Sequence, residues 1–236
     1  MAVHTNSQTF RRTIRRYYAA HSRSLPWRHT HDPYKILVSE VMLQQTQVGR
    51  VTAYYKNFLH KFPTIKVLAK ASLADVLRAW QGLGYNRRAL MLKRAAEHTV
   101  RIYGGKLPQD AGLLDDLPGI GINTAGAIAA FAFNTPSVFI ETNIRRVFIH
   151  FFFPGRSTVH DRNILKLVEE TMDRKNPREW YYASAIVKLF LAKNALTQRQ
   201  IFKTFAEPKE RIEKVLDALG KEGLISKSGI YYQISI

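Results

Sequence analysis

Two glutamates occupy positions from which a carboxyl group could do acid–base chemistry. Glu40 lies within residues 36–43, Ile-Leu-Val-Ser-Glu-Val-Met-Leu, and Glu141 follows the apolar run Val-Phe-Ile at 138–140. A carboxylate among apolar side chains is unfavourable unless it is compensated, so Glu40 is expected either to be held protonated or to face a cleft. Both situations suit a general acid. The alternative is a surface glutamate on a half-exposed helix.

A second kind of chemistry, anion binding, is indicated at residues 117–126, Leu-Pro-Gly-Ile-Gly-Ile-Asn-Thr-Ala-Gly. Pro118 should end the preceding helix, because the residue before a proline disfavours helical geometry. Gly119 and Gly121 can take positive φ and present no Cβ to a partner. The next helix then begins with backbone N–H groups that suit a phosphate. The segment therefore reads as a helix-hairpin-helix that holds a DNA backbone, or as an ordinary corner between helices.

Composition favours a polyanionic partner. The chain has 236 residues, and 36 Lys and Arg against 18 Asp and Glu give a net charge of +18. Phosphate contacts would supply much of the affinity, although charge that only maintains solubility is the alternative. The chain contains no cysteine, which excludes disulfides, a thiol nucleophile and Cys-ligated metal sites.

The ends and the apolar runs of the sequence bear on location. The N-terminal residues 1–7 lack the apolar segment of a signal peptide, and no apolar run approaches the about 18 residues of a membrane-spanning helix. We therefore expect a cytoplasmic, nucleoid-associated protein that does not contact a membrane, and we expect a monomer.

Helical periodicity predicts the elements that position these groups. Asp32 and Pro33 should cap and begin the helix of Glu40. At 82–85, Gly-Leu-Gly-Tyr predicts a turn whose Tyr85 could stack on a base or open a duplex, or could equally fill the core. In addition to the hairpin, helices are predicted at residues 8–21, 33–45, 47–61, 64–70, 73–81, 87–103, 142–152, 160–173 and 177–194.

The C-terminal part has a different pattern. Residues 197–205 and 208–220 predict two short helices, and residues 224–226 and 231–234 alternate as strands around a turn at 227–229. The expected fold is therefore mainly α, with a helical domain at 1–195 and a small winged-helix-like α+β module at 196–236. That module could bind DNA or could serve only as a packing appendage.

Six motifs occur in order between residues 25 and 130. They are Leu-Pro-Trp-Arg, Asp-Pro-Tyr, Ser-Glu-Val-Met-Leu-Gln-Gln-Thr-Gln-Val, Trp-Gln-Gly-Leu-Gly-Tyr, Leu-Pro-Gly-Ile-Gly and Thr-Ala-Gly-Ala-Ile-Ala. Together they closely resemble the catalytic domain of MutY-type adenine DNA glycosylases, which belong with endonuclease III to the helix-hairpin-helix (HhH-GPD) superfamily. The likeness covers roughly residues 10–155, and later parts match poorly. It implies a two-lobed helical glycosylase fold acting on double-stranded DNA with a mismatched or damaged base.

The resemblance also implies roles for individual residues. Glu40 matches the general acid that protonates the flipped base, Glu141 stands in the place of the catalytic aspartate, and Asn143 lies beside it. Tyr85 matches the wedge inserted into the duplex. The remaining matches are Arg23, Leu25, Trp27, Arg28 and Val48 in the base pocket, Gln45 and Thr46 near the estranged partner base, and Leu117, Gly119, Gly121 and Thr124 at the DNA backbone. In relatives the hairpin can hold a monovalent cation, and we expect no other cofactor or metal.

The chain departs from the family pattern at several positions. The four cysteines of the iron–sulfur loop are missing, so we expect a form that lacks the cluster, with the loop either missing or replaced in the neighbourhood of residues 192–200. Glu141 is one methylene longer than aspartate, and a displacement of about 1 Å can lower a rate on the order of 100-fold. Asn123 stands where lyases of the family have lysine, so a Schiff base is not expected. Ile186 stands where relatives often have an acid, and the separate domain that reads 8-oxoguanine is absent from this sequence.

These observations leave three hypotheses for the function. The first is a monofunctional glycosylase that removes adenine opposite 8-oxoguanine or G. The second is a thymine or uracil mismatch glycosylase on the same scaffold, with Arg23, Trp27 and Asn123 deciding the base. The third is a catalytically impaired DNA-binding protein on a glycosylase frame. The presence of Glu40 and of an acid at 141 favours an enzyme, since a pure binder has no use for a buried carboxyl group.

Overall fold

The computed structural model describes residues 7–21, 24–153, 156, 158–186, 196–197, 210, 213, 216–217, 225–228 and 231–234. These residues form two compact units. The central unit comprises Arg23–Phe139 and Met172–Glu179, and the terminal unit comprises Met1–Ser22, Ile140–Thr171 and Trp180–Ile236. Each unit is described by itself below.

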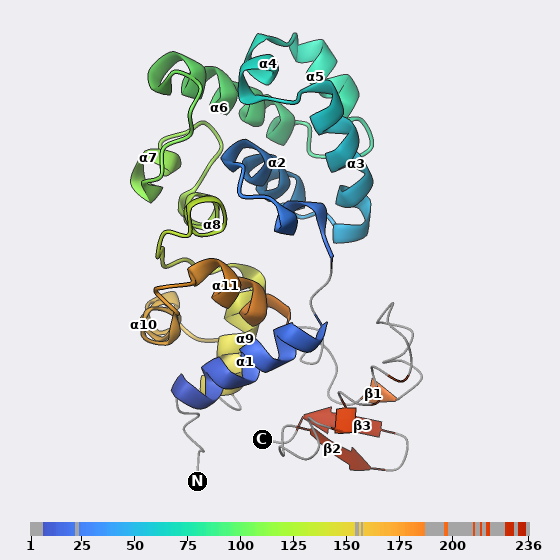
Figure 1. Ribbon diagram of the computed structural model, residues 1–236, viewed down its shortest axis with the longest axis vertical. Helices are drawn as coiled ribbons and strands as arrows, with labels where there is room; N and C mark the ends of the chain where they lie inside the picture. Colours follow the sequence, from blue (N-terminus) through green and yellow to red (C-terminus); the bar gives the residue numbers. More distant parts are fainter. Residues whose placement is uncertain are drawn as a thin grey trace. The chain divides into compact units, whose positions relative to one another are not determined.

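The central unit is built around one buried helix, α2 (Pro33–Leu43), which carries Glu40. Asp32 caps it as predicted, because its side chain accepts hydrogen bonds from the backbone N–H groups of Tyr34 and Lys35 at 2.9 and 3.3 Å. Figure 1 shows α2 among its neighbours. The surrounding elements are η1 (Pro26–His29), α3 (Val48–Lys61), α4 (Ile65–Lys70), α5 (Leu73–Trp80), α6 (Arg87–Tyr103), α7 (Ala111–Asp115) and α8 (Ile122–Phe133).

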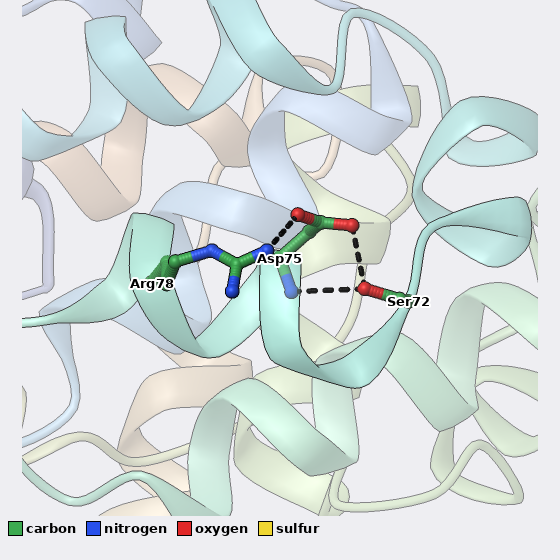
Figure 2. A network of polar contacts seen from close by, with 3 residues as sticks. All are labelled: Ser72, Asp75 and Arg78. Atoms are coloured by element: carbon green, nitrogen blue, oxygen red, sulfur yellow. Dashed lines mark hydrogen bonds and ion pairs between the residues drawn. The ribbon is translucent and has the colours of Figure 1, made fainter.

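Helix α5 begins at a polar network that local sequence explains (Figure 2). The Ser72 hydroxyl accepts a hydrogen bond from the Asp75 backbone N–H at 3.1 Å and donates one to the Asp75 carboxylate. The same carboxylate pairs with Arg78, one turn further along the helix. These hydrogen bonds, that of Ser72 first, lower the pKa of Asp75. The network is fully on the surface, so it defines a helix start without contributing much to stability.

The terminal unit packs α1 (Ser7–His21) with α9 (Thr142–Phe152), α10 (Asp161–Thr171) and the larger part of α11 (Pro177–Ile186). Phe10 lies at its centre, with ring centroids 5.1 Å from Phe148, 5.5 Å from Phe151 and 5.2 Å from Phe152. Arg11, on the same helix, donates to the backbone carbonyl of Thr171 at 2.7 Å. The predicted amphipathic helix at 8–21 is therefore confirmed, with its apolar face in the core.

A three-stranded antiparallel sheet follows in the order β1 (Leu196–Thr197), β3 (Tyr231–Ile234), β2 (Ile225–Ser228). The two predicted C-terminal strands do pair, with Ile225 opposite Ile234, but the turn predicted at 227–229 is wrong at its first two residues, because Lys227 and Ser228 continue β2 and pair with Tyr232 and Tyr231. The helix predicted at 197–205 is wrong at its first residue, because Thr197 pairs with Tyr231 in the sheet. Most of that helix and of the one predicted at 208–220 lies outside the described residues, and the domain boundary at 196 stays a prediction.

Candidate functional site

Glu40 is the one acidic residue of α2, and it is half-buried. On its own face of the helix, Ile36 and Leu37 are buried and Leu43 is half-buried. Apolar neighbours limit the hydration of the carboxyl group, while partial exposure keeps it reachable from solvent. From the sequence, Glu40 could lie among apolar side chains or on the surface. The structure shows it half-buried, in surroundings that suit a proton donor.

Of the residues matched to the base pocket, Trp27 and Arg28 lie in the 3-10 helix η1, Leu25 is its N-cap and Val48 begins α3. Trp27 is buried, and its ring meets that of Tyr55 edge to face at a centroid distance of 5.4 Å. Leu25, Arg28 and Val48 are half-buried. Arg23 lies outside the described residues.

Arg178 fixes the segment that carries Trp27 and Arg28. It is 4% exposed, and its guanidinium donates to the backbone carbonyls of Arg28 at 2.9 Å and Thr30 at 2.8 Å. It also bonds to the Phe131 carbonyl at the end of α8 and to His31 Nδ1. One side chain therefore joins residues 28–31 to α8 within the central unit.

Gln45 and Tyr85 share an unusual backbone conformation. Their φ angles are 53° and 51°, in the left-handed region that residues other than glycine seldom adopt. Both side chains are exposed, Tyr85 by 62%, which rules out the alternative that Tyr85 fills the core. Gly82 and Gly84 in the same turn also have positive φ, of 95° and 75°. The turn therefore presents the tyrosine ring to solvent, as a wedge requires.

Arg88 lies between the segment of Gln45 and the turn of Tyr85. One of its terminal nitrogens, Nη1, donates to the carbonyls of Val41, Met42 and Gln44, and the other, Nη2, donates to the Thr46 hydroxyl at 3.1 Å and the Gly84 carbonyl at 3.2 Å. Its guanidinium lies 5.5 Å from the Trp80 ring centroid and 5.3 Å from that of Tyr85. Burial lowers the pKa of Arg88 from its usual value, yet an arginine stays charged.

The hairpin joins α7 to α8 as predicted. Gly119 has φ of 77°, and a Cβ there would collide with the Met91 side chain, so glycine is required on both counts. Gly121 is the N-cap of α8, so the backbone N–H groups of the first turn are available to an anion.

The other hairpin residues differ in exposure. Leu117 is buried and Asn123 is exposed. The Thr124 hydroxyl accepts a hydrogen bond from Gln44 at 3.3 Å, which links the hairpin helix to the end of α2. A monovalent cation at this hairpin stays a prediction.

Glu141 and Asn143 belong to the terminal unit. Glu141 is exposed at the N-cap of α9, and its Oε1 accepts a hydrogen bond from Asn143 Nδ2 at 3.4 Å. A helix N-terminus favours a negative charge. The surroundings of Glu141 therefore suit an ionised carboxylate. An ionised carboxylate is also what the resemblance implies here, where Glu141 stands in the place of a catalytic aspartate.

In the part of the chain that the structure describes, no group of three or more His, Cys, Asp or Glu is arranged to hold a metal ion. None of the helices there combines the length and apolar character needed to cross a bilayer. The iron–sulfur cluster implied by the resemblance does not fit, since this sequence supplies no thiolate ligand. The expectation of a cofactor-free protein stays a prediction.

Sequence reasoning missed the roles of Arg88 and Arg178, which bind backbone carbonyls within the central unit. Arg88 and Arg178 each lie in the first turn of a helix, α6 and α11, where the helix dipole disfavours a cation. That unfavourable placement could have indicated their roles, because it suggests that another interaction stabilises the positive charge.

Together, a helical fold, a glycine hairpin before α8 and a glutamate in a buried helix define a helix-hairpin-helix protein of the DNA-repair type. The chain belongs to the HhH-GPD superfamily of base excision DNA repair proteins, whose family model matches residues 38–172, more than half of the sequence.

Several curated relatives are named adenine DNA glycosylase. The protein from Buchnera aphidicola subsp. Baizongia pistaciae is 38% identical over 169 residues, covering 71% of this chain and 47% of the relative. The Homo sapiens protein is 36% identical over 187 residues, covering 74% and 34%. The Mycobacterium tuberculosis protein (strain H37Rv) is 45% identical over 132 residues, covering 56% and 43%. The chain thus spans less than half the length of these relatives.

Solved structures show the same fold. A thermostable thymine-DNA glycosylase superposes with a TM-score of 0.73 at 27% identity, covering 77% of this chain and 85% of that one. A trapped endonuclease III–DNA covalent intermediate, described as an estranged-adenine complex, superposes with a TM-score of 0.62 at 18% identity and the same coverage. The predicted fold class, mainly α with the helix-hairpin-helix glycosylase architecture, is confirmed.

Proposed function

We propose that this protein is a monofunctional DNA glycosylase of base excision repair, which hydrolyses the N-glycosidic bond of adenine mispaired with 8-oxoguanine or G. Membership of the superfamily and the names of the curated relatives support this assignment. The observation that supports it most is Glu40, a half-buried glutamate and the one acidic residue of a helix whose residues 36–38, 41 and 42 are apolar and buried.

The proposed reaction follows from what these side chains can do. The enzyme must first extrude the base from the stack, and the exposed ring of Tyr85 is suited to occupy the gap. Glu40 then gives its proton to a ring nitrogen of adenine as the C1′–N9 bond breaks, so that the base leaves neutral. The Glu141 carboxylate stabilises the positive charge on the sugar. Water adds its oxygen to C1′, and its proton returns to a carboxylate, leaving an abasic site.

The absence of an amine at position 123 supports hydrolysis without strand scission. Asn123 is exposed in the first turn of α8, and an amide cannot form a Schiff base with C1′. The proposal includes a monomer that acts on nucleoid DNA in the cytoplasm, with at most a monovalent cation at the hairpin.

A second candidate, excision of thymine or uracil mispaired with G, is favoured by one observation. The solved structure described as a thymine-DNA glycosylase has a TM-score of 0.73 and 27% identity to this chain. The two candidates share the scaffold and differ in the base that fits the pocket around Arg23, Trp27 and Asn123.

The test is a set of labelled duplexes that carry A opposite 8-oxoguanine, A opposite G, T opposite G or U opposite G, treated with hot alkali after incubation. We expect alkali-dependent cleavage at A, lost in the Glu40→Gln variant. Cleavage at T or U alone would establish the second candidate. Binding to the duplexes without cleavage of any of them would leave a DNA-binding protein on a glycosylase frame.

A further inference from the structure

Arg88 connects two loops that are distant in sequence. On one side it binds the carbonyls of Val41, Met42 and Gln44 and the hydroxyl of Thr46, and on the other the carbonyl of Gly84. The first set is the C-terminal end of the Glu40 helix, where helical carbonyls have no partner within the helix. A single planar guanidinium thus satisfies the end of α2 and holds the turn of Tyr85 beside it.

Each of the two loops contains a residue in a strained conformation. Gln45 and Tyr85 are two of the three residues other than glycine with positive φ among those that the structure describes. Such conformations persist when the surroundings over-determine them, and they concentrate at functional sites. Arg88 bonds to both chain neighbours of Gln45 and to the residue before Tyr85, so it constrains the two strained positions together.

The surroundings of Arg88 explain why the side chain is arginine. It is half-buried, its guanidinium lies within 5.5 Å of the Trp80 and Tyr85 ring centroids, and all its hydrogen-bond acceptors in the described residues are carbonyl or hydroxyl oxygens. The Gly84 carbonyl also accepts a hydrogen bond from Trp80 Nε1 at 3.1 Å, which fixes the turn from a second direction. A lysine ammonium has neither the planar shape nor the number of donors to make all these bonds.

We propose that Arg88 is a positioning residue that holds Gln45 and Tyr85 at a fixed separation, so that both engage the same duplex at once. The proposal rests on the proposed function, in which Tyr85 fills the gap left by the flipped base, and on the resemblance to adenine DNA glycosylases, which implies that Gln45 lies near the estranged partner base. Since both groups are on loops, their separation depends on the side chain that binds both loops. Loss of Arg88 would let them move independently, which would weaken recognition of the partner base and slow extrusion of adenine.

The first experiment measures loop order without relying on activity. Amide hydrogen exchange is followed by mass spectrometry for the full-length wild type, Arg88→Lys and the control Arg78→Lys. Arg78 is an exposed arginine in an ion pair of the same unit (Figure 2). We expect faster exchange in Arg88→Lys over both 44–46 and 82–86, with the Arg78 variant unchanged. Faster exchange in one loop alone, in neither loop, or evenly through the chain would overturn the proposal.

The second experiment measures recognition of the partner base. Single-turnover rates are compared for A opposite 8-oxoguanine and A opposite G. A small displacement of groups that position a substrate can lower a rate on the order of 100-fold, so we expect Arg88→Lys to lose about 10- to 100-fold and the ratio of the two rates to shrink. An unchanged ratio would contradict coupling between the loops. A wild type that cleaves no duplex would overturn the proposed function alone, since the exchange measurement still decides the role of Arg88.

Discussion

Glu40 and Glu141, the two carboxyl groups assigned to the reaction, lie in contrasting surroundings. Glu40 is half-buried in α2, where Ile36 and Leu37 on the same helix face are apolar and buried, whereas Glu141 is exposed at the N-cap of α9. Apolar surroundings favour a neutral carboxylic acid, and a helix N-terminus favours a carboxylate. The contrast teaches that environment can assign the two roles, proton donor and charge stabiliser, to residues of one type.

The largest expected effect is that of Glu40→Gln, which removes the proton but keeps the shape of the side chain. General acid catalysis contributes about 100- to 10,000-fold, so we expect a loss of that size in the single-turnover rate. The affinity of the variant for the duplex should stay within about twofold of the wild-type affinity, because the Glu40 proton is needed for bond cleavage and not for binding. The control is Glu179→Gln, the same change at an exposed glutamate of α11. Equal losses of rate in Glu40→Gln and Glu179→Gln would show that Glu40 has no special role as proton donor.

Glu141 should respond differently to substitution. Glu141→Gln removes the negative charge, and loss of one electrostatic group typically lowers a rate about 100-fold. Glu141→Asp keeps the charge and introduces the residue that the family has at this position, so we expect activity at or above that of the wild type. Rates measured for both variants on A opposite 8-oxoguanine decide this. If the glutamine variant kept full activity, the carboxylate at the helix N-terminus would have no part in the reaction.

Tyr85→Ala tests the proposed role of Tyr85 as a wedge in the duplex. Stacking of an aromatic ring on a base contributes about 1–3 kcal/mol, so we expect the rate to fall about 10-fold or more. Ile102→Ala is the control, because Ile102 is a similarly exposed apolar residue, at 55%, on α6. Fluorescence of 2-aminopurine beside the mispair would report unstacking directly. If the Tyr85→Ala variant gave the same fluorescence change as the wild type, a wedge role for Tyr85 would be excluded.

The smallest effect concerns the helix that Glu141 begins. His150 on α9 is half-buried beside Phe151, and burial lowers its pKa below the usual 6.5. Folding therefore favours the neutral imidazole, and the free energy of unfolding should decrease as the pH falls below 6.5, until the folded-state pKa is passed. His150→Gln should weaken this dependence, measured as the change in Tm between neutral and mildly acidic pH. The same change in Tm for variant and wild type would show that His150 does not contribute.

Much of this arrangement follows from local sequence patterns. Asp32-Pro33, the apolar segment around Glu40 and the Pro-Gly-x-Gly hairpin predict α2 and α8, because caps, periodicity and glycine act over a few residues. The placement of Arg88 and Arg178 in a first helical turn indicates that some other group holds each charge, but the sequence does not identify which backbone carbonyls do so. Strand β1 was also missed, because two residues acquire strand geometry only by pairing with β3.

The most direct test of the central claim is release of free adenine from a duplex with A opposite 8-oxoguanine, followed by mass spectrometry in ¹⁸O water. Wild type and Glu40→Gln are compared side by side. We predict that the wild type releases adenine, leaves the strand intact before alkali and places one ¹⁸O at C1′, while the Glu40→Gln variant releases adenine at least about 100-fold more slowly. Equal rates of adenine release from the two proteins, or strand scission without alkali, would contradict the assignment of Glu40 as the acid of a monofunctional glycosylase.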